Sequence, residues 1–95
     1  EQRRDFTYVG DIVEANILAA TSPYPPETIF NIGNGDNRSV NQIADLIGGE
    51  RIFIDSVLEP RSTLSDNTKA KELLGWSPKI TIDDWIPKYK SKLGL

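Results

Sequence analysis

The chain has 95 residues, of which 38% are hydrophobic and 26% are charged, and it contains neither cysteine nor histidine. This composition is typical of a globular domain, and it excludes disulfides, thiolate nucleophiles, imidazole bases and the usual zinc sites. The net charge of −3 does not favour a broad surface for nucleic acid or for an anionic membrane, and no secretory signal is visible. We therefore expect a cytoplasmic protein with one modest core.

The first third of the chain predicts strand, helix, connection and strand. Residues 6–9 are β-branched or aromatic and predict a short strand. Asp11 is predicted as the N-cap of a helix whose apolar residues recur at helical spacing up to about Thr21. Three prolines in residues 22–27 indicate an exposed connection, and residues 28–32 predict a second strand.

The middle third predicts a loop, a helix and a further strand. Residues 33–38 have the composition of a loop. Ser39 and Gln42 fit a capping box at the start of a second helix, which the pair Gly48-Gly49 ends. Residues 51–55 then predict a third strand.

The last third predicts an extended polar run over residues 56–65 and two further helices. Asp66 or Thr68 can cap the third helix, which Gly75 ends. The fourth helix is expected from Ile82, with Thr81 as its cap and a kink or a later start because of Pro87. The large apolar side chains predicted for the core are Phe30, Leu74, Trp76 and Trp85.

A glycine-rich turn is the first candidate for chemistry. Gly33-Asn34-Gly35 lies between a predicted strand and a predicted helix, and Asp55 follows twenty positions after Gly35. This arrangement imitates a dinucleotide-binding fingerprint. However, Arg38 stands where that motif requires a third small residue, so an ordinary turn is the favoured interpretation.

Catalytic residues are not predicted in this chain. No tyrosine is followed by lysine four positions later, and no serine lies between glycines in the pattern of a nucleophile. We therefore expect no catalytic, cofactor-binding or metal-binding residue here.

Arginines are the remaining candidates for a binding site. Arg4 lies beside the first predicted strand, and Arg61 lies in the extended run after Glu59. Guanidinium groups bind phosphate through paired hydrogen bonds, and a carboxylate can accept hydrogen bonds from ribose or sugar hydroxyls. The alternative is that these arginines are solvated and paired with nearby acids.

Three stretches resemble the nucleotide-sugar epimerases and dehydratases of the extended short-chain dehydrogenase family, with UDP-glucose 4-epimerases as the nearest members. The first is similar to the pattern Arg-Asp-Phe-x-Tyr-Val-Asp-Asp, and the second to Phe-Asn-Ile-Gly-x-Gly. The third is similar to the closing segment of these enzymes. In this chain they are Arg4-Asp5-Phe6-Thr7-Tyr8-Val9-Gly10-Asp11, Phe30-Asn31-Ile32-Gly33-Asn34-Gly35, and residues 59–78.

The resemblance implies a fold and a division of labour. The family's N-terminal Rossmann domain holds NAD and the catalytic tyrosine and lysine, and its C-terminal domain binds the nucleoside diphosphate. Residues 1–95 would then be a small α/β substrate-binding domain with a few short strands and about four helices, lacking the Rossmann domain. By position, Arg4 resembles the arginine that contacts the substrate pyrophosphate, and Glu59 matches the acid that binds ribose.

This sequence departs from the family pattern at two places. The family's Arg-Pro-Gly-Asp/Glu stretch is replaced by Ser56-Val57-Leu58-Glu59, which removes a second phosphate ligand. Arg61, two residues further on, could substitute for that arginine. Gly10 replaces the first acid of the Asp-Asp pair, which leaves Asp11.

The sequence therefore predicts the nucleotide-sugar recognition part of an NAD-dependent epimerase or dehydratase, inactive alone. The absence of methionine and the abrupt strand-like start are expected of a portion cut from a longer protein. Its expected partners are the nucleotide-sugar substrate and the Rossmann domain. Where the Rossmann domain is absent, a second copy of the chain could cover the apolar surface that would otherwise face it. Two alternatives stay open: a free-standing binding module derived from this domain, and a small nucleotide-binding enzyme that uses the Gly33 turn.

Overall fold

A computed structural model describes residues 2–55 and 61–95 of the chain. In these residues it contains four helices and one two-stranded sheet, which confirms the α/β prediction. The elements, in chain order, are β1 (Arg3–Arg4), α1 (Val9–Ala20), β2 (Arg38–Ser39), α2 (Val40–Ile47), α3 (Thr68–Leu74) and α4 (Ile82–Leu93). The strands β1 and β2 pair antiparallel, with Arg3 opposite Ser39 and Arg4 opposite Arg38.

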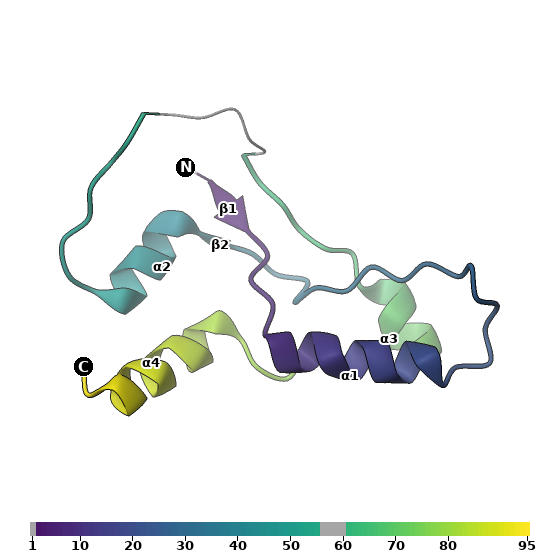
Figure 1. Cartoon of the computed structure of the whole chain (residues 1–95). Coiled ribbons are helices and arrows are strands. Elements are labelled where there is room, and N and C mark those ends of the chain that lie inside the picture. Colours follow the sequence, from purple (N-terminus) through teal and green to yellow (C-terminus); the bar gives the residue numbers. More distant parts are fainter. Residues whose placement is uncertain (1, 56–60) are drawn as a thin grey trace.

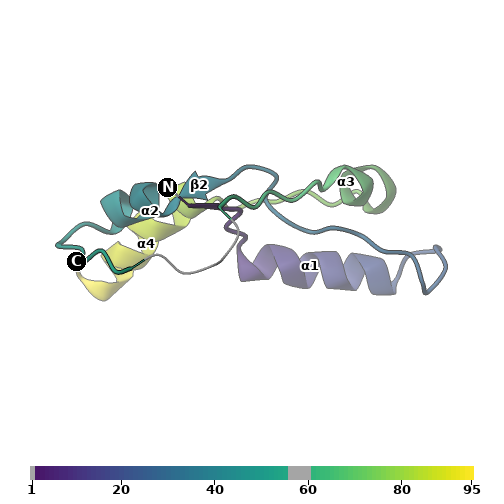
Figure 2. The ribbon, with the colours of Figure 1, turned by 90° about the horizontal axis from the view of Figure 1, so that it is seen from above.

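The molecule is flat and open. Its principal extents are 49 × 35 × 16 Å and its radius of gyration is 16.0 Å, larger than the roughly 13 Å of a compact chain of about 100 residues. Figure 1 shows β1, β2, α2 and α4 together at one end and α1 with α3 at the other, and Figure 2 shows how thin this arrangement is. Much of the apolar surface is therefore not covered by other parts of the described chain.

The core lies where α1 and α3 meet the chain that follows α3. Ala15, Ala70 and Trp76 are its buried members, and the partly buried side chains of Leu18, Phe30, Ile32 and Leu74 pack around them. The indole Nε1 of Trp76 donates a hydrogen bond of 2.9 Å to the carbonyl oxygen of Asp11. The largest buried side chain thus has its one polar atom satisfied.

Most of the helix boundaries agree with the sequence signals. Ser39 and Gln42 form the predicted capping box of α2, and the Thr81 hydroxyl accepts from the Asp84 N–H at the start of α4. Gly75 ends α3 in the left-handed region, at φ 66°. The helix α4 continues through Pro87 to Leu93, so the later start considered for it is wrong.

The predicted caps of two helices are wrong. The N-cap of α3 is Asn67, while the Asp66 carboxylate accepts hydrogen bonds from the backbone and the hydroxyl of Thr68. Asp11 is not the cap of α1, because that helix begins at Val9 with Tyr8 before it.

Three predicted strands do not form. Residues 6–8, 28–32 and 51–55 have no strand structure, and β1 lies earlier, at Arg3–Arg4. Their composition suits a sheet, but a strand also needs a neighbouring backbone with which to exchange hydrogen bonds. In residues 51–55 the side chains of Ile52 and Ile54 are 90% and 84% exposed. The prediction for residues 56–60 lies outside the described residues.

Trp85 was predicted in the core and is not there. It is 38% exposed and stacks on Tyr89, with ring centroids 4.5 Å apart. In the described part of the chain, no helix is long and apolar enough to cross a membrane.

Candidate functional site

Three backbone segments meet beside the N-terminus. The strand β1 pairs with β2 on one side, and on the other side Arg3 forms a parallel bridge with Ser62. The Arg3 N–H donates to the Arg61 carbonyl at 2.8 Å, and the Thr63 N–H donates to the Arg3 carbonyl at 3.1 Å. The tertiary structure therefore brings the segment that contains Arg61 next to the strand that contains Arg4.

The arginines of these segments lie on two different faces of the small sheet, because side chains alternate along extended backbone. Successive side chains of an extended backbone point to opposite faces, and residues paired across two strands share a face. Arg4 pairs with Arg38, so both lie on one face of the small sheet. Because Arg61 precedes Ser62, which opposes Arg3, the same alternation predicts the Arg61 side chain on the Arg4 face.

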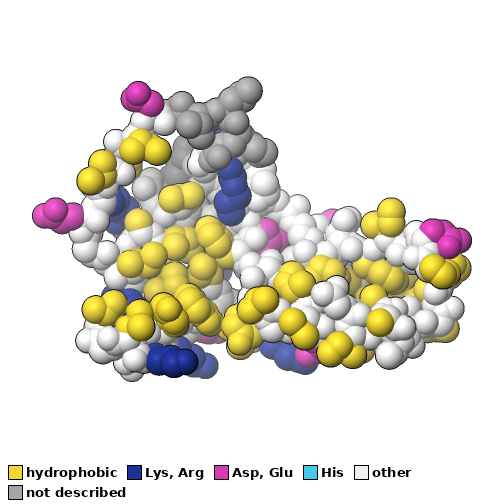
Figure 3. Space-filling model, viewed as in Figure 1, with side chains coloured by type: hydrophobic (Ala, Val, Ile, Leu, Met, Phe, Trp, Pro, Cys, Tyr) yellow, Lys and Arg dark blue, Asp and Glu magenta, His cyan; other side chains and the backbone are white. Residues whose placement is uncertain are grey.

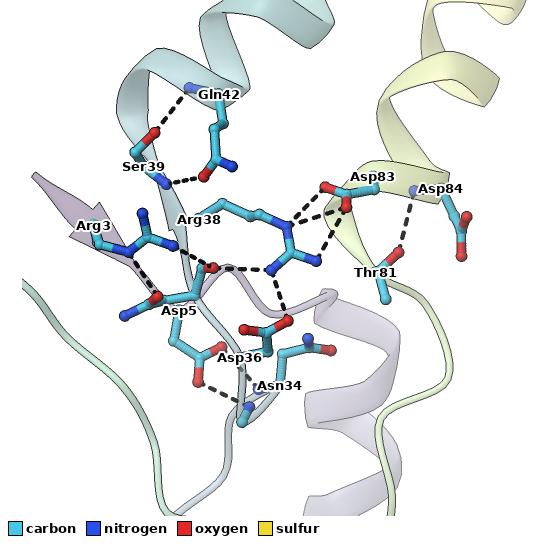
Figure 4. Close-up of polar contacts among 12 residues, drawn as sticks. Arg3, Asp5, Asn34, Asp36, Arg38, Ser39, Gln42, Thr81, Asp83 and Asp84 are labelled. Carbon is cyan, nitrogen blue, oxygen red and sulfur yellow. Dashed lines mark hydrogen bonds and ion pairs between the residues drawn. The ribbon is translucent and has the colours of Figure 1, made fainter.

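The charge of Arg38 is compensated by two carboxylates. Its guanidinium contacts Asp36 at 2.7 Å and Asp83 at 3.1 Å, as Figure 4 shows. Its hydrogen bonds, with the larger effect from Asp36 and the smaller from Asp83, raise the pKa of Arg38 above its ordinary value. Arg38 therefore ties β2 to the start of α4.

Arg3, on the opposite face, is also held within the protein. Its Nε donates to the Asn37 side-chain oxygen at 2.9 Å, and its Nη2 donates to the Asn37 carbonyl at 3.3 Å. Arg4 is half-buried, and its Nη1 donates to the carbonyl oxygen of Arg3 at 2.8 Å. Arg61 is exposed.

The Asp5 carboxylate holds this region together. It accepts hydrogen bonds from the N–H groups of Asn34 at 2.9 Å, Gly35 at 3.0 Å and Ser65 at 3.0 Å. Figure 4 shows Asp5 beneath the β1–β2 pair, directed toward the turn that contains Asn34. Because Asp5 directly follows Arg4, these bonds fix the backbone from which the Arg4 side chain extends.

The glycine-rich turn is built around this carboxylate. A Cβ on Gly33 would lie 2.3 Å from the Ser65 Cβ, and Gly35 has φ +81°. The Asn67 side-chain amide also donates to the Gly33 carbonyl at 2.8 Å. The glycines thus allow close backbone approach within the protein.

The resemblance of this turn to a dinucleotide fingerprint is therefore superficial. The N–H groups of Asn34 and Gly35 point at an anion, but that anion is the Asp5 side chain. A phosphate at the same place would have to displace this carboxylate. Asp55, the other half of the imitation, is exposed and lies outside any strand.

Asp11 is a second buried carboxylate that joins distant segments. It is 4% exposed and accepts hydrogen bonds from the N–H groups of Lys79 at 2.9 Å and Ile80 at 3.2 Å. It therefore connects α1 to the chain that leads into α4, although it does not cap the helix.

Of the three predicted site residues, Arg4 lies on the strand that pairs, through Arg3, with the segment that contains Arg61, and Glu59 lies outside the described residues. Asp5, which holds the backbone beside Arg4, was not singled out from the sequence, although it follows Arg4 directly in the motif. Among the described residues, no group of three or more carboxylates forms a candidate metal site.

Comparison with known proteins identifies the family. Residues 1–33 match the sequence profile of the NAD dependent epimerase/dehydratase family. The chain is 38% identical over 95 residues to a UDP-glucuronate 4-epimerase of Thermodesulfobacterium geofontis, covering 92% of this chain and 29% of that protein.

Solved structures match the fold as well. The UDP-glucose 4-epimerase of Thermotoga maritima, solved with UDP-glucose, has a TM-score of 0.80 at 34% identity, over 98% of this chain and 33% of that chain. The UDP-glucuronic acid 4-epimerase of Bacillus cereus, solved with UDP-glucuronic acid and NAD, has a TM-score of 0.80 at 30% identity, over 97% of this chain and 33% of that one. The chain thus spans about a third of the length of these relatives. By sequence and by fold, it belongs to the NAD-dependent epimerase/dehydratase family.

Proposed function

We propose that this chain recognises the nucleoside diphosphate of a nucleotide sugar, as the C-terminal substrate-binding domain of an NAD-dependent epimerase or dehydratase. The observation that carries the proposal is the pairing of the Arg4 strand with the segment that contains Arg61. A pyrophosphate offers two adjacent anionic groups, and a guanidinium group binds each through paired hydrogen bonds. Arg61 would then supply the phosphate contact that Ser56 removes from the family pattern.

Glu59 completes the proposed site as the acceptor for ribose hydroxyls. It precedes Arg61 by two residues, so the same segment would supply both a phosphate ligand and a ribose ligand. The similar Thermotoga maritima and Bacillus cereus enzymes were solved with UDP-sugars, which supports this substrate class.

We place the NAD site in the part of the relatives' length that this chain does not span. When bound, NAD accepts hydride from the sugar and returns it. The described residues do not fit the dinucleotide at the Gly33 turn, because Asp5 already accepts the N–H groups of Asn34 and Gly35. The role of this chain is to bind and orient the substrate, and on its own it turns nothing over.

Calorimetric titration of the 95-residue chain with UDP-glucose, UDP and NAD tests this function. We expect weak saturable binding of UDP and UDP-glucose that Arg4→Ala and Arg61→Ala each reduce roughly tenfold, the loss of about 1.4 kcal/mol typical of a hydrogen bond to a charged group. Raising the salt concentration should weaken the same binding.

Arg51→Ala is the matched control. Arg51 is an exposed arginine paired with Asp45 on α2, and it is not one of the proposed site residues, so its removal should leave UDP binding unchanged. Equal losses of UDP binding for Arg51→Ala and Arg4→Ala would mean that the loss reflects the overall charge of the protein and not a specific site. Saturable binding of NAD alone, or measurable turnover by the purified chain, would contradict the proposal directly.

A further inference from the structure

The arginines and lysines of this protein are dispersed. The chain has a net charge of −3, and on the side of the molecule drawn in Figure 3 the described Lys and Arg side chains lie in several separate places. Binding of a diphosphate therefore depends on a few individual guanidinium groups. The charge that each of these groups offers to a ligand depends on the carboxylates beside it.

Arg38 shares one face of the small sheet with Arg4. The two residues are directly opposite each other in the β1–β2 register, which places their Cβ atoms about 4.5–5.5 Å apart. Like charges directly opposite each other on one face of a sheet are destabilising. The carboxylates of Asp36 and Asp83 on Arg38 offset this repulsion in the structure.

The two carboxylates bind different parts of the Arg38 guanidinium. Asp83 accepts from Nε through both of its oxygens, at 3.2 and 3.1 Å, and its Oδ2 lies 3.1 Å from Nη2. Asp36 accepts from Nη1 at 2.7 Å. Figure 4 shows Asp83 at the start of α4 on one side of the guanidinium and Asp36 on another. Asp83 therefore anchors Arg38 independently of the partner that Nη1 has.

Asp36 is the more exposed of the two partners. Its side chain is 66% exposed, and that of Asp83 is 43% exposed. An ion pair with so exposed a carboxylate is weak, because water screens it and solvates the carboxylate once it is released. A pyrophosphate has more charge and more acceptor oxygens than one carboxylate, so it binds a guanidinium more strongly. The Nη1 of Arg38 can therefore exchange Asp36 for a phosphate while Asp83 stays bound.

We propose that Arg38 is a further ligand of the nucleoside diphosphate, and that the nucleotide displaces Asp36 from it on binding. The proposal rests on the proposed function, because it places Arg38 in the same site as Arg4. It also assigns a role to Asp36, whose carboxylate competes with the nucleotide for Arg38 and thereby lowers the affinity. Asp83 keeps the guanidinium in position in both states.

Calorimetric titration of UDP into Asp36→Asn tests the competition. We expect this variant of the 95-residue chain to bind UDP roughly three- to tenfold more tightly than the unaltered chain, because Arg38 then has no competing anion at Nη1. Asp36→Asn combined with Arg38→Gln should not show the gain, since the gain acts through Arg38. Tighter binding is an effect that partial unfolding does not produce.

Asp45→Asn is the matched control. Asp45 is a 70% exposed carboxylate paired with Arg51, so its removal makes the same change in net charge and also releases one arginine. The control variant should bind UDP as the unaltered chain does. Equal gains for Asp36→Asn and Asp45→Asn would overturn the proposal, because the effect would then reflect the overall charge. An unchanged or weakened affinity of Asp36→Asn would overturn it as well.

The displacement is also measurable at Asp36 itself. In the free chain, the hydrogen bond and the charge of Arg38 lower the pKa of Asp36 below its ordinary value of 3.8. Saturation with UDP should return this pKa toward the ordinary value, because Arg38 then donates to phosphate. Carboxyl-carbon titration by nuclear magnetic resonance measures the change, and Asp66, whose pKa is lowered by Thr68, should not respond. A pKa of Asp36 that stays equally low in the UDP complex would contradict the displacement.

The same titrations separate this inference from the proposed function. UDP binding that Arg4→Ala weakens and Asp36→Asn leaves unchanged would retain the recognition role and reject the competition at Arg38. Tighter binding by Asp36→Asn that Arg4→Ala does not weaken would retain Arg38 as a phosphate ligand and reject Arg4. If neither the unaltered chain nor Asp36→Asn binds UDP saturably, both proposals are wrong.

Discussion

The region around Asp5 and the outer face of α1, formed by Val9, Val13 and Ile17, differ in whether the chain itself supplies the partners that their side chains need. Around Asp5, polar groups from three separate segments satisfy one another without any outside partner. On α1, Val9, Val13 and Ile17 leave apolar surface in contact with solvent. Within the described residues, the backbone N–H groups around Asp5 thus have their acceptor, although the buried Ser65 Oγ has no hydrogen-bond partner, whereas this apolar face of α1 is not covered.

Removal of Trp76 should have the largest effect, because it is the largest buried side chain of the core. The variant tests whether this small core holds both regions in place. Trp76 is 1% exposed, and its indole joins the chain that follows α3 to α1 through the Asp11 carbonyl. Trp76→Ala should destabilise the chain by roughly 3–5 kcal/mol, which in a domain of this size amounts to unfolding. Urea titration followed by circular dichroism measures the loss. Trp85→Ala, at a half-exposed tryptophan, should cost far less, and equal losses would refute the assignment of the core.

Removal of the Asp5 carboxylate tests the polar side of the comparison. Asp5→Ala leaves the N–H groups of Asn34, Gly35 and Ser65 without their acceptor. We expect a loss of roughly 1.5–3 kcal/mol in the free energy of unfolding, together with faster amide exchange at these three residues. The exposed Asp55→Ala is the control and should be neutral. Unchanged exchange at Asn34 and Gly35 would mean that the turn does not depend on Asp5.

A methyl group on Gly33 tests the close packing of the turn that the Asp5 carboxylate holds. Its Cβ would lie 2.3 Å from the Ser65 Cβ, whereas a Cβ on Gly49 would meet nothing within 4 Å. Gly33→Ala should therefore cost about 1–3 kcal/mol by overpacking. Gly49→Ala should cost only about 1–2 kcal/mol from its left-handed backbone. Thermal unfolding of both variants compares the two causes, and a larger loss at Gly49 would contradict the close approach at Gly33.

The smallest expected effect concerns the ion pair between Arg38 and Asp36. The hydrogen bond and the charge of Arg38 lower the pKa of Asp36 below its ordinary value of 3.8. A lowered pKa means that the pair contributes stability above the ordinary value, and that this contribution disappears as the pH falls through the lowered value. Titration of the carboxyl carbons by nuclear magnetic resonance should show the shift, and Arg38→Gln should reduce it.

Asp66 is the internal control for that titration. Its pKa is also lowered, but by hydrogen bonds from Thr68. Arg38→Gln should therefore leave the pKa of Asp66 where it was. A parallel change at both carboxyl groups would indicate a general loss of structure and not the loss of one pair.

The contrast between correct and wrong sequence predictions follows the range of the interactions. Ser39 with Gln42 and Thr81 with Asp84 act across three residues, so their sequence pattern contains both partners. Residues 28–32 and 51–55 have equally clear patterns, but a strand depends on a partner that its own sequence does not specify. This is why the helix boundaries were predicted well and the strands were not.

The same reason explains what was missed in the candidate site. Asp5 reaches Asn34 across 29 positions and Ser65 across 60, and Asp11 reaches Lys79 across 68. No local pattern links residues at such separations. The motif around Arg4 identified the family, but it did not indicate that the acid beside this arginine supports the glycine-rich turn.

By itself, the sequence determined the four helices, most of their ends and the family, because capping signals, helical periodicity and family motifs are local. Only the tertiary structure decided which backbones pair, that Arg61 lies beside the Arg4 strand, and that the Gly33 turn encloses a carboxylate of the protein. These features depend on long-range hydrogen bonds and close packing, whose partners are selected only when distant segments meet.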